Sequence, residues 1–397
     1  MNAYVLDWLS LVMRWAHFIA GVSWIGASFY FVWLDNSLTP PQKEDDARND
    51  MFGELWSVHG GGFYHNQKFP TGPKREPLPQ DLHWFYWEAY STWITGMALL
   101  AIVYWAGAAA FLIDRSILDI TTGEAIAISV AVIVVGWFVY DGLCRAFETR
   151  PTALWCCLAA FLLALDWGLF HVFGGRAAAI HLGAAIGTIM VANVFFIIIP
   201  GQKRMLAQIR AGKTPDSRPG MLGKMRSVHN TYLTLPVLFL MISNHYPMTY
   251  AAPNGWWVIA LISAAGVLVR RFFVLSHKHR YVVALPVAAA VLLAGVAIAI
   301  VPRASAVPSN GSVSYADVAP IVAQRCAVCH AAQPSEAGFS SAPEGVLLDT
   351  PDHIRANARR VYEQAVTTHA MPLGNITHMT EPERATLGAW ITEGAKI

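Results

Sequence analysis

The chain has 397 residues, of which 55% are hydrophobic and only 14% are charged, a balance that excludes an ordinary soluble protein. The net charge of +2 does not indicate a nucleic-acid partner. Fifteen tryptophans and nineteen phenylalanines fit a protein in contact with membrane lipid, because aromatic side chains gather at membrane interfaces.

Hydropathy divides most of the chain into membrane-spanning segments. A spanning helix needs about 20 mostly apolar residues. The first apolar run has no small-residue cleavage site, so we interpret it as a retained span and not as a signal peptide. The segment at 229–245 is the shortest and most polar. We predict eight spans, at 5–34, 84–113, 122–144, 152–172, 177–199, 229–245, 254–275 and 281–301.

The loops between these segments alternate in basic content. Lys and Arg gather in the first, third, fifth and seventh loops, whereas the even loops contain only Arg115 and Arg176. Basic loops stay in the cytoplasm. The pattern therefore places the N-terminus outside the membrane and, after eight crossings, the C-terminus outside as well.

A C-x-x-C-H box follows the last predicted span. Its cysteines, Cys326 and Cys329, and the adjacent His330 are typical of covalent haem c attachment, with two thioether bonds and a proximal imidazole ligand. Covalent haem attachment takes place outside the bacterial inner membrane, so the box independently predicts a periplasmic C-terminal domain. The alternative is half a zinc site, for which the later chain offers only His353, His369 and His378.

Met371 is the predicted second axial ligand, and both Met371 and His330 would hold the iron. A thioether opposite the histidine raises the reduction potential, which suits an electron acceptor. Met379 is the alternative ligand, and either methionine could instead fill the core. The other cysteines lie in apolar segments, where a small buried residue is the simpler interpretation: Cys144, Cys156 and Cys157.

These observations predict an all-α protein of two domains. Residues 1–301 form an eight-helix transmembrane bundle, residues 302–313 a Pro/Ser-rich linker, and residues 314–397 a small periplasmic domain like class I cytochromes c. In that domain, 314–324 is expected to form a helix, and the capping box Thr380–Glu383 is expected to open the terminal one. The expected location is the bacterial inner membrane, with several crossings.

Ionisable residues inside spans are costly and indicate function. In the outer half, His17 and His181 each share a helix face with small residues. An imidazole beside small residues suits a flat macrocycle, so both are candidate axial ligands of a non-covalent haem b. The alternative is that each histidine is hydrogen-bonded between helices.

The cytoplasmic half contains a second polar group. His59 and His65 flank three consecutive glycines, which let backbone approach a ligand closely. Glu88 lies one turn inside the second span, and His229 opens the sixth. These four residues are our candidates for catalysis in a cage for a flat polar heterocycle. The alternative is an aromatic belt facing lipid.

Three stretches resemble the membrane-bound urate hydroxylase family, in which a urate oxidase N-terminal membrane domain precedes a cytochrome c domain. They are GELWSVHGGGFY (53–64), WFYWEAY (84–90) and HNTYLTLP (229–236), and the resemblance covers essentially the whole chain. It implies that urate is oxidised to 5-hydroxyisourate. It also implies that the electrons leave through the cytochrome to a respiratory-chain acceptor, such as another cytochrome or a terminal oxidase.

A cytoplasmic urate site would lie across ~30 Å of hydrocarbon from a periplasmic haem. That distance is too long for one efficient electron transfer, so a relay haem near His17 and His181 is expected. A quinol-to-cytochrome electron conduit is the alternative function, although a lipid-soluble substrate does not need the glycine-rich loop. A transporter or sensor is a third interpretation, but the two halves of the bundle show no clear internal repeat.

Overall fold

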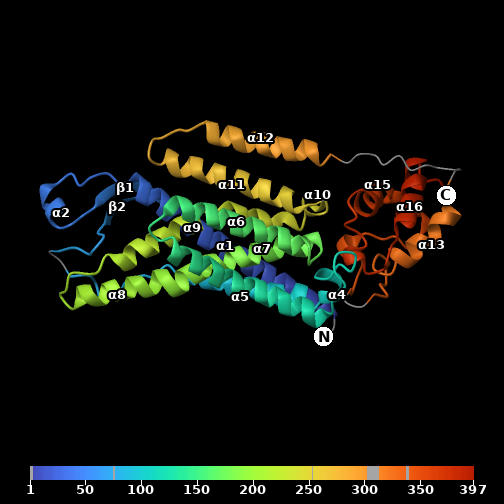
Figure 1. The fold of residues 1–397 in the computed structure, drawn as a ribbon, viewed down its shortest axis with the longest axis horizontal. Helices are drawn as coiled ribbons and strands as arrows, with labels where there is room; N and C mark the ends of the chain where they lie inside the picture. Colours follow the sequence, from blue (N-terminus) through green and yellow to red (C-terminus); the bar gives the residue numbers. More distant parts are fainter. Residues whose placement is uncertain (1–2, 75–76, 253, 302–312, 337–338) are drawn as a thin grey trace.

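The computed structural model describes residues 3–74, 77–252, 254–301, 313–336 and 339–397. Long helices run side by side along one axis, and a helical C-terminal region lies at one end of them (Figure 1). The N-terminus lies at that same end, and a β-hairpin lies at the opposite end. The predicted linker, apart from Val313, falls outside the described residues.

The bundle consists of residues 3–301. All eight predicted spans fall on helix. The elements are α1 (Ala3–Ser37), α2 (Glu44–Arg48), β1 (Gly53–His59), β2 (Gly62–Lys68), α3 (Trp87–Leu99), the π-helical η1 (Leu100–Trp105), α4 (Ala108–Phe111), α5 (Thr122–Ala146), α6 (Pro151–Phe170), α7 (Gly175–Ala192), the π-helical η2 (Asn193–Ile198), α8 (Ile199–Arg210), α9 (Arg218–Ser243), α10 (Pro247–Tyr250), α11 (Trp256–Ser276) and α12 (Ala284–Ala299).

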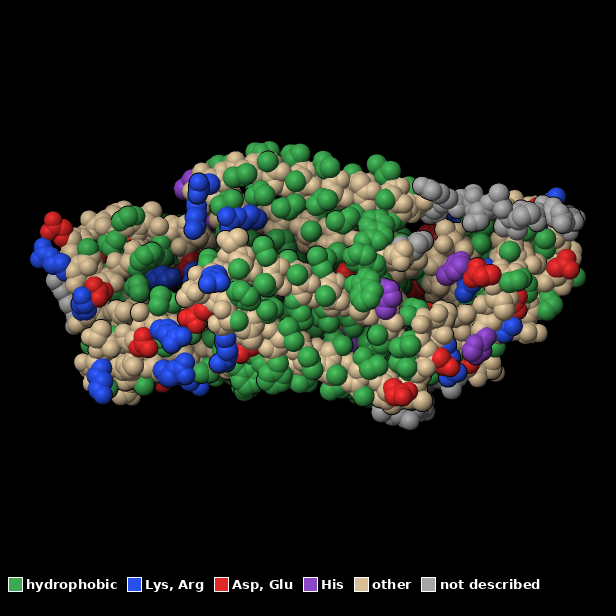
Figure 2. Space-filling model, viewed as in Figure 1, with side chains coloured by type: hydrophobic (Ala, Val, Ile, Leu, Met, Phe, Trp, Pro, Cys, Tyr) green, Lys and Arg blue, Asp and Glu red, His purple; other side chains and the backbone are tan. Residues whose placement is uncertain are grey.

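Five helices in the described part of the chain are long and apolar enough to cross a membrane, which makes this a multi-pass membrane protein. They are Tyr4–Ser37, Thr122–Ala146, Pro151–Phe170, Gly175–Arg210 and Trp256–Ser276. Hydrophobic side chains cover the middle of the bundle, and charged side chains gather toward the two ends (Figure 2). The count of eight crossings stays a prediction, because α12 has only 16 residues and α3 continues into the π-helical η1. The orientation in the membrane also stays a prediction.

Local signals explain where several helices begin. Thr121 and Glu124 form a capping box before α5, in which the Glu124 carboxylate accepts the Thr121 amide at 2.9 Å. Pro151 occupies the first turn of α6. The most buried spanning candidate is the continuous helix Gly175–Arg210, which begins with α7, because 61% of its apolar window is buried, against at most 22% for the other four.

The prediction of an all-α fold is wrong at one place. Strands β1 and β2 form an antiparallel hairpin, with His59 opposite Gly62 and Trp56 opposite His65. The turn between them is Gly60-Gly61, with φ angles of 58° and 81°. A two-residue hairpin turn of this kind needs positive φ at both positions, which glycine adopts without strain. The glycine run therefore closes a turn, and no atom lies within 4 Å of where a Cβ of Gly60 or Gly61 would stand.

The C-terminal region has its own hydrophobic cluster. Val318 and Val322 of the first helix pack with Leu387 and Trp390 of the last, and all four are almost fully buried. The predicted helix at 314–324 and the Thr380 capping box are both confirmed. The elements are α13 (Tyr315–Arg325), η3 (Pro343–Gly345), α14 (Pro351–Ala356), α15 (Ala358–Val361), η4 (Tyr362–Thr367), η5 (Leu373–Asn375) and α16 (Glu381–Thr392).

Candidate functional site

The C-x-x-C-H box begins where α13 ends. Cys326 is the residue that ends the helix, and its carbonyl oxygen accepts the amide of His330 at 3.0 Å. The His330 ring donates from Nδ1 to the carbonyl oxygen of Val346 at 3.0 Å. A carbonyl can only accept, so this bond fixes the tautomer and leaves Nε2 as the nitrogen with a free lone pair.

Both thiols of the box are free. Burial raises the pKa of Cys326 to about 12 and that of Cys329 to about 11, so both remain protonated at neutral pH. Among the described residues, no group of three or more His, Cys, Asp or Glu side chains could hold a metal ion.

The structure separates the two candidate methionine ligands. Met379 is only 3% exposed and belongs to the hydrophobic cluster of the C-terminal region. Met371 is half-buried at the edge of that cluster, and its carbonyl oxygen accepts from Arg384 Nη1 at 2.7 Å. Two free thiols, an oriented imidazole and a half-buried methionine are the kinds of donor that a covalent haem needs.

His17 lines a cavity of about 420 Å³ between α1, α3, α7 and α9. Its Nδ1 lies 3.0 Å from the Thr92 carbonyl oxygen, to which it can only donate. Nε2 is then the basic nitrogen. The ring packs against Gly96, where an added Cβ would lie 2.9 Å from His17 Cε1. The walls are mostly apolar, and His245 also lines the cavity.

His181 is fully buried and does not line that cavity. Its Nδ1 lies 2.7 Å from the Ala177 carbonyl oxygen, and its Nε2 lies 2.7 Å from Ser129 Oγ on α5. Both ring nitrogens therefore have partners within the bundle. His17 and His181 share neither a hydrogen bond nor a cavity wall in the described part of the chain, and the geometry of His181 matches the alternative of a histidine hydrogen-bonded between helices.

His229 is buried within α9, in a polar network of the bundle. Its Nδ1 is hydrogen-bonded to the Tyr140 hydroxyl at 2.8 Å. Asn193 Nδ2 lies 2.9 Å from that hydroxyl and 2.9 Å from Asn230 Oδ1. The side-chain amide of Asn230 in turn donates to the Met190 carbonyl oxygen at 2.9 Å. The network ties α5, α7, η2 and α9 together, and its polar groups satisfy one another.

The other predicted catalytic residues lie elsewhere. His65 Nε2 donates to the Glu54 carboxylate at 2.5 Å, and the His65 ring stacks on Trp56 with ring centroids 4.3 Å apart. His59 lies exposed at the tip of the hairpin, next to its turn. Glu88 stands in the first turn of α3. Among the described residues, no hydrogen bond or ion pair joins His59, His65, Glu88 and His229 to one another.

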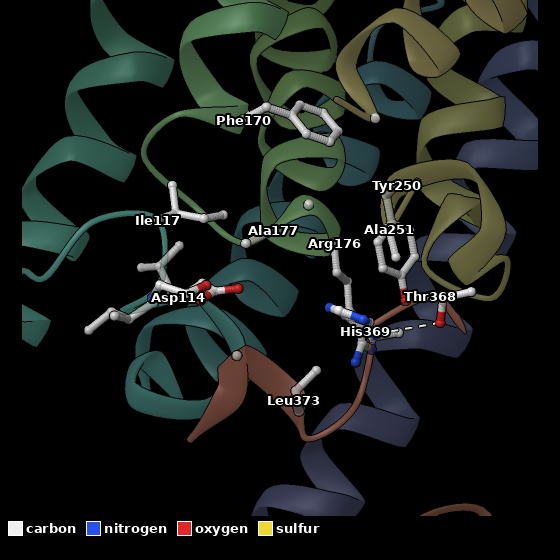
Figure 3. Close-up of a pocket in the computed structure, with 18 of the residues that line it drawn as sticks. Asp114, Ile117, Phe170, Arg176, Ala177, Tyr250, Ala251, Thr368, His369 and Leu373 are labelled. Atoms are coloured by element: carbon white, nitrogen blue, oxygen red, sulfur yellow. Dashed lines mark hydrogen bonds between the residues drawn. The ribbon is translucent and has the colours of Figure 1, made fainter. Parts of the chain in front are cut away.

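A second cavity, of about 280 Å³, lies between the bundle and the C-terminal region (Figure 3). The segment after α4, the start of α7 and the chain around Tyr250 form the bundle side. Residues 368–370, 373 and 374 form the other side. Arg176 and Asp114 face the cavity from opposite sides in Figure 3. The hydropathy pattern did not identify this site, although Arg176 stood out as one of two basic residues in the even loops.

Close backbone contacts hold the two parts together. Gly374 lies so near the bundle that an added Cβ would stand 2.5 Å from the Ile113 carbonyl oxygen. The rings of Phe111 and Phe339 have centroids 6.2 Å apart, and the Ser340 hydroxyl donates to Asp7. The segment that carries Met371 is therefore packed directly against the end of the bundle.

Fold and sites together define a multi-pass helical membrane protein whose last 85 residues offer the donors for a covalent haem. The family model described as urate oxidase N-terminal matches residues 3–301, and the chain belongs to this family. Comparison with curated proteins and with solved structures gives no significant match.

Proposed function

We propose that the protein is a membrane-bound urate hydroxylase that delivers electrons to a covalent haem c in its C-terminal region. One observation supports this above the others: the urate oxidase N-terminal family covers residues 3–301, and a C-x-x-C-H box follows in the same chain. Family membership suggests urate as the substrate and makes the protein an oxidoreductase.

The overall reaction balances without oxygen as a reactant. The urate monoanion and one water give 5-hydroxyisourate, two electrons and one proton. A bound ferric haem c supplies a one-electron acceptor, so each urate needs two successive transfers and reoxidation by a respiratory-chain acceptor. The protein must hold the anion, take up the proton and admit the water.

The residues of the box have distinct parts in this proposal. Cys326 and Cys329 anchor the haem, and Val346 fixes the imidazole of His330 through the bond described above. Arg384 holds the carbonyl oxygen of Met371 and so fixes the backbone of the residue that would supply the thioether ligand. These bonds would keep the segments of both iron ligands in place before any substrate binds.

A non-covalent haem b remains a separate proposal, now supported by His17 alone. The orientation of His17 by Thr92 leaves Nε2 available toward an apolar cavity, whereas both nitrogens of His181 are bonded. The same cavity would also suit the ring of a quinol, which is the alternative function of an electron conduit. The two functions differ in which reductant delivers electrons to the haem.

The test is an anaerobic visible spectrum of the purified, oxidised holoprotein before and after addition of urate. We expect the α-band of reduced haem c to appear, with about two haems reduced per urate consumed, because the oxidation releases two electrons. Reduction by a quinol but not by urate would replace the proposal with the electron conduit.

A further inference from the structure

We propose that the cavity between the bundle and the C-terminal region is the urate site, with Arg176 binding the anion. This inference rests on the proposed function and moves the substrate from the cytoplasmic half to the end of the bundle that contacts the C-terminal region. It is drawn from the charge, the walls and the position of the cavity.

The cavity contains a basic side chain that has no direct ion-pair partner. Arg176 makes no ion pair with a carboxylate among the described residues, and its Nε is buried without a hydrogen-bond partner there. Its guanidinium lies over the ring of Phe111, with Cζ 5.5 Å from the centroid, and it also lies beside Tyr104, so stacking leaves the edge of the fork to meet a ligand in the cavity. A guanidinium without a direct ion pair in a partly enclosed site favours an anionic ligand, and the carboxylate of Asp114 stands on the other side of the cavity.

The opposite side offers a hydrogen-bond acceptor. Asp114 Oδ1 accepts the amide of Ser116 at 3.0 Å and its hydroxyl at 2.6 Å, and both bonds fix the carboxylate at the cavity wall. Figure 3 places Asp114 across the cavity from Arg176. The urate monoanion carries carbonyl oxygens, which can accept from Arg176, and ring N–H groups, which can donate to Asp114. The two sides of the cavity therefore match its two kinds of hydrogen-bonding group.

The remaining wall suits a flat ring that can hydrogen-bond. Burial raises the pKa of Tyr250 to about 12, so its phenol stays a neutral O–H group at physiological pH. Gly175 and Gly255 allow the backbone of Tyr250 to pack closely at the cavity, because an added Cβ would stand 2.2 Å and 2.6 Å from the Tyr250 carbonyl oxygen. Phe170 adds an aromatic face, and about 280 Å³ is near the lower end for small-molecule sites.

The position of the cavity removes the need for a relay across the membrane. Ala370 and Leu373, the neighbours of the Met371-Pro372 pair, both line it. A urate bound here contacts the segment that carries the predicted iron ligand. In a cytoplasmic site it would be ~30 Å of hydrocarbon away. Electrons then pass between neighbouring groups.

The experiment measures urate binding to full-length holoprotein whose haem has been reduced beforehand with dithionite, so that no turnover occurs. Equilibrium dialysis with radiolabelled urate gives Kd for the parent, for Arg176→Gln and for Arg115→Gln. Arg115 is the matched control, because it is also basic and lies next to the cavity-lining Ser116 but is itself exposed. We expect Kd to rise at least about tenfold in Arg176→Gln and to stay unchanged in Arg115→Gln.

A second variant tests the cavity without changing charge. Ile117 lines the cavity and is 39% exposed, so Ile117→Trp fills it from the outside with little risk to folding. It should weaken urate binding at least about tenfold, while the haem spectrum and midpoint potential stay at the parent values.

The outcomes separate this inference from the proposed function. If urate does not bind or reduce the parent protein, the proposed function itself fails. If the parent is active and both Arg176→Gln and Ile117→Trp bind urate normally, only the location is wrong. A shifted haem midpoint potential in Arg176→Gln, with an unchanged Kd, would assign Arg176 to the haem propionates and overturn the inference.

Discussion

Replacing Gly374 with alanine should detach the C-terminal region from the bundle. Two effects act together in this variant. Gly374 has a φ of 57°, in the left-handed region that costs an alanine about 1–2 kcal/mol. The added Cβ would also stand 2.5 Å from the carbonyl oxygen of Ile113 and 3.2 Å from that of Ala110.

Gly345 provides a control for the first effect. Its φ is 67°, yet no atom lies within 4 Å of where its Cβ would stand. Gly345→Ala therefore carries similar backbone strain without the collision. Since Cβ contacts under 3.0 Å are essentially never found and the atoms opposite Gly374 are backbone, the two parts must separate by about half an ångström. Overpacking of this kind costs about 1–3 kcal/mol, or about 5- to 150-fold in the docking equilibrium.

Hydrogen–deuterium exchange of the holoprotein measures the docking directly. Leu112 and Ile113 are almost fully buried at the contact, and we expect amides of the segment 108–118 to exchange faster by that factor in Gly374→Ala. Gly345→Ala should leave this segment at the parent rate. Equal exchange in the two glycine variants would show that the Gly374 contact does not hold the parts together, and would refute the reasoning.

Four further predictions concern the haem, the membrane and the hairpin. Replacing Cys326 or Cys329 with alanine should remove one thioether bond and abolish the normal covalent haem, which haem staining of a denaturing gel measures. Full retention of the stain would show that the C-x-x-C-H box does not attach a haem. His17→Ala should remove any b-type band from the pyridine haemochrome spectrum and leave the c-type band. If the parent protein shows only the c-type band, the proposal of a haem b in the membrane domain is wrong. A periplasm-specific reporter fused after Ile397 should be active, and activity of a cytoplasmic reporter there would overturn the eight-span topology. The Gln42 amide and His65 lower the pKa of Glu54, so this carboxylate stabilises the hairpin above its unfolded pKa of about 4.3 and loses that effect as the pH falls through the lower folded value. Fluorescence compared with the Trp56→Phe variant should report loosening only below about pH 4, and the same transition in Glu54→Gln would contradict this assignment.

Local sequence was sufficient for the helices. A run of about 20 apolar residues has few alternatives to a spanning helix, and all eight predicted segments are helical. The capping box at Thr380 marked the start of α16 because its two hydrogen bonds join residues three positions apart. Such signals lie wholly within one element and need no knowledge of the fold.

The hairpin shows where a local signal has two interpretations. Glycines admit a ligand near the backbone, and they also allow positive φ in a turn. The choice depended on whether Trp56 and His65 pair across strands, which the composition of the loop does not state. The sequence allows either use of these glycines, and the pairing of the two strands shows that they form a turn.

The candidate site depended on contacts that no local pattern contains. The second partner of His181 is Ser129, on a different helix, so its availability as a ligand could not be judged from its own segment. The interface cavity joins four stretches spread between residues 110 and 374. Arg176 alone gave a hint, as a basic side chain against the charge pattern of the loops.

The short segment from Thr368 to Gly374 has a consequence for how the gene can be recombined. It carries the predicted iron ligand Met371, and the same few residues form the contact with the bundle. A foreign electron carrier fused after residue 301 would bring its own ligand loop and would lack the close contact that Gly374 makes with the backbone of Ile113. The two parts of this chain are therefore expected to be inherited as a pair, although each has a hydrophobic cluster of its own.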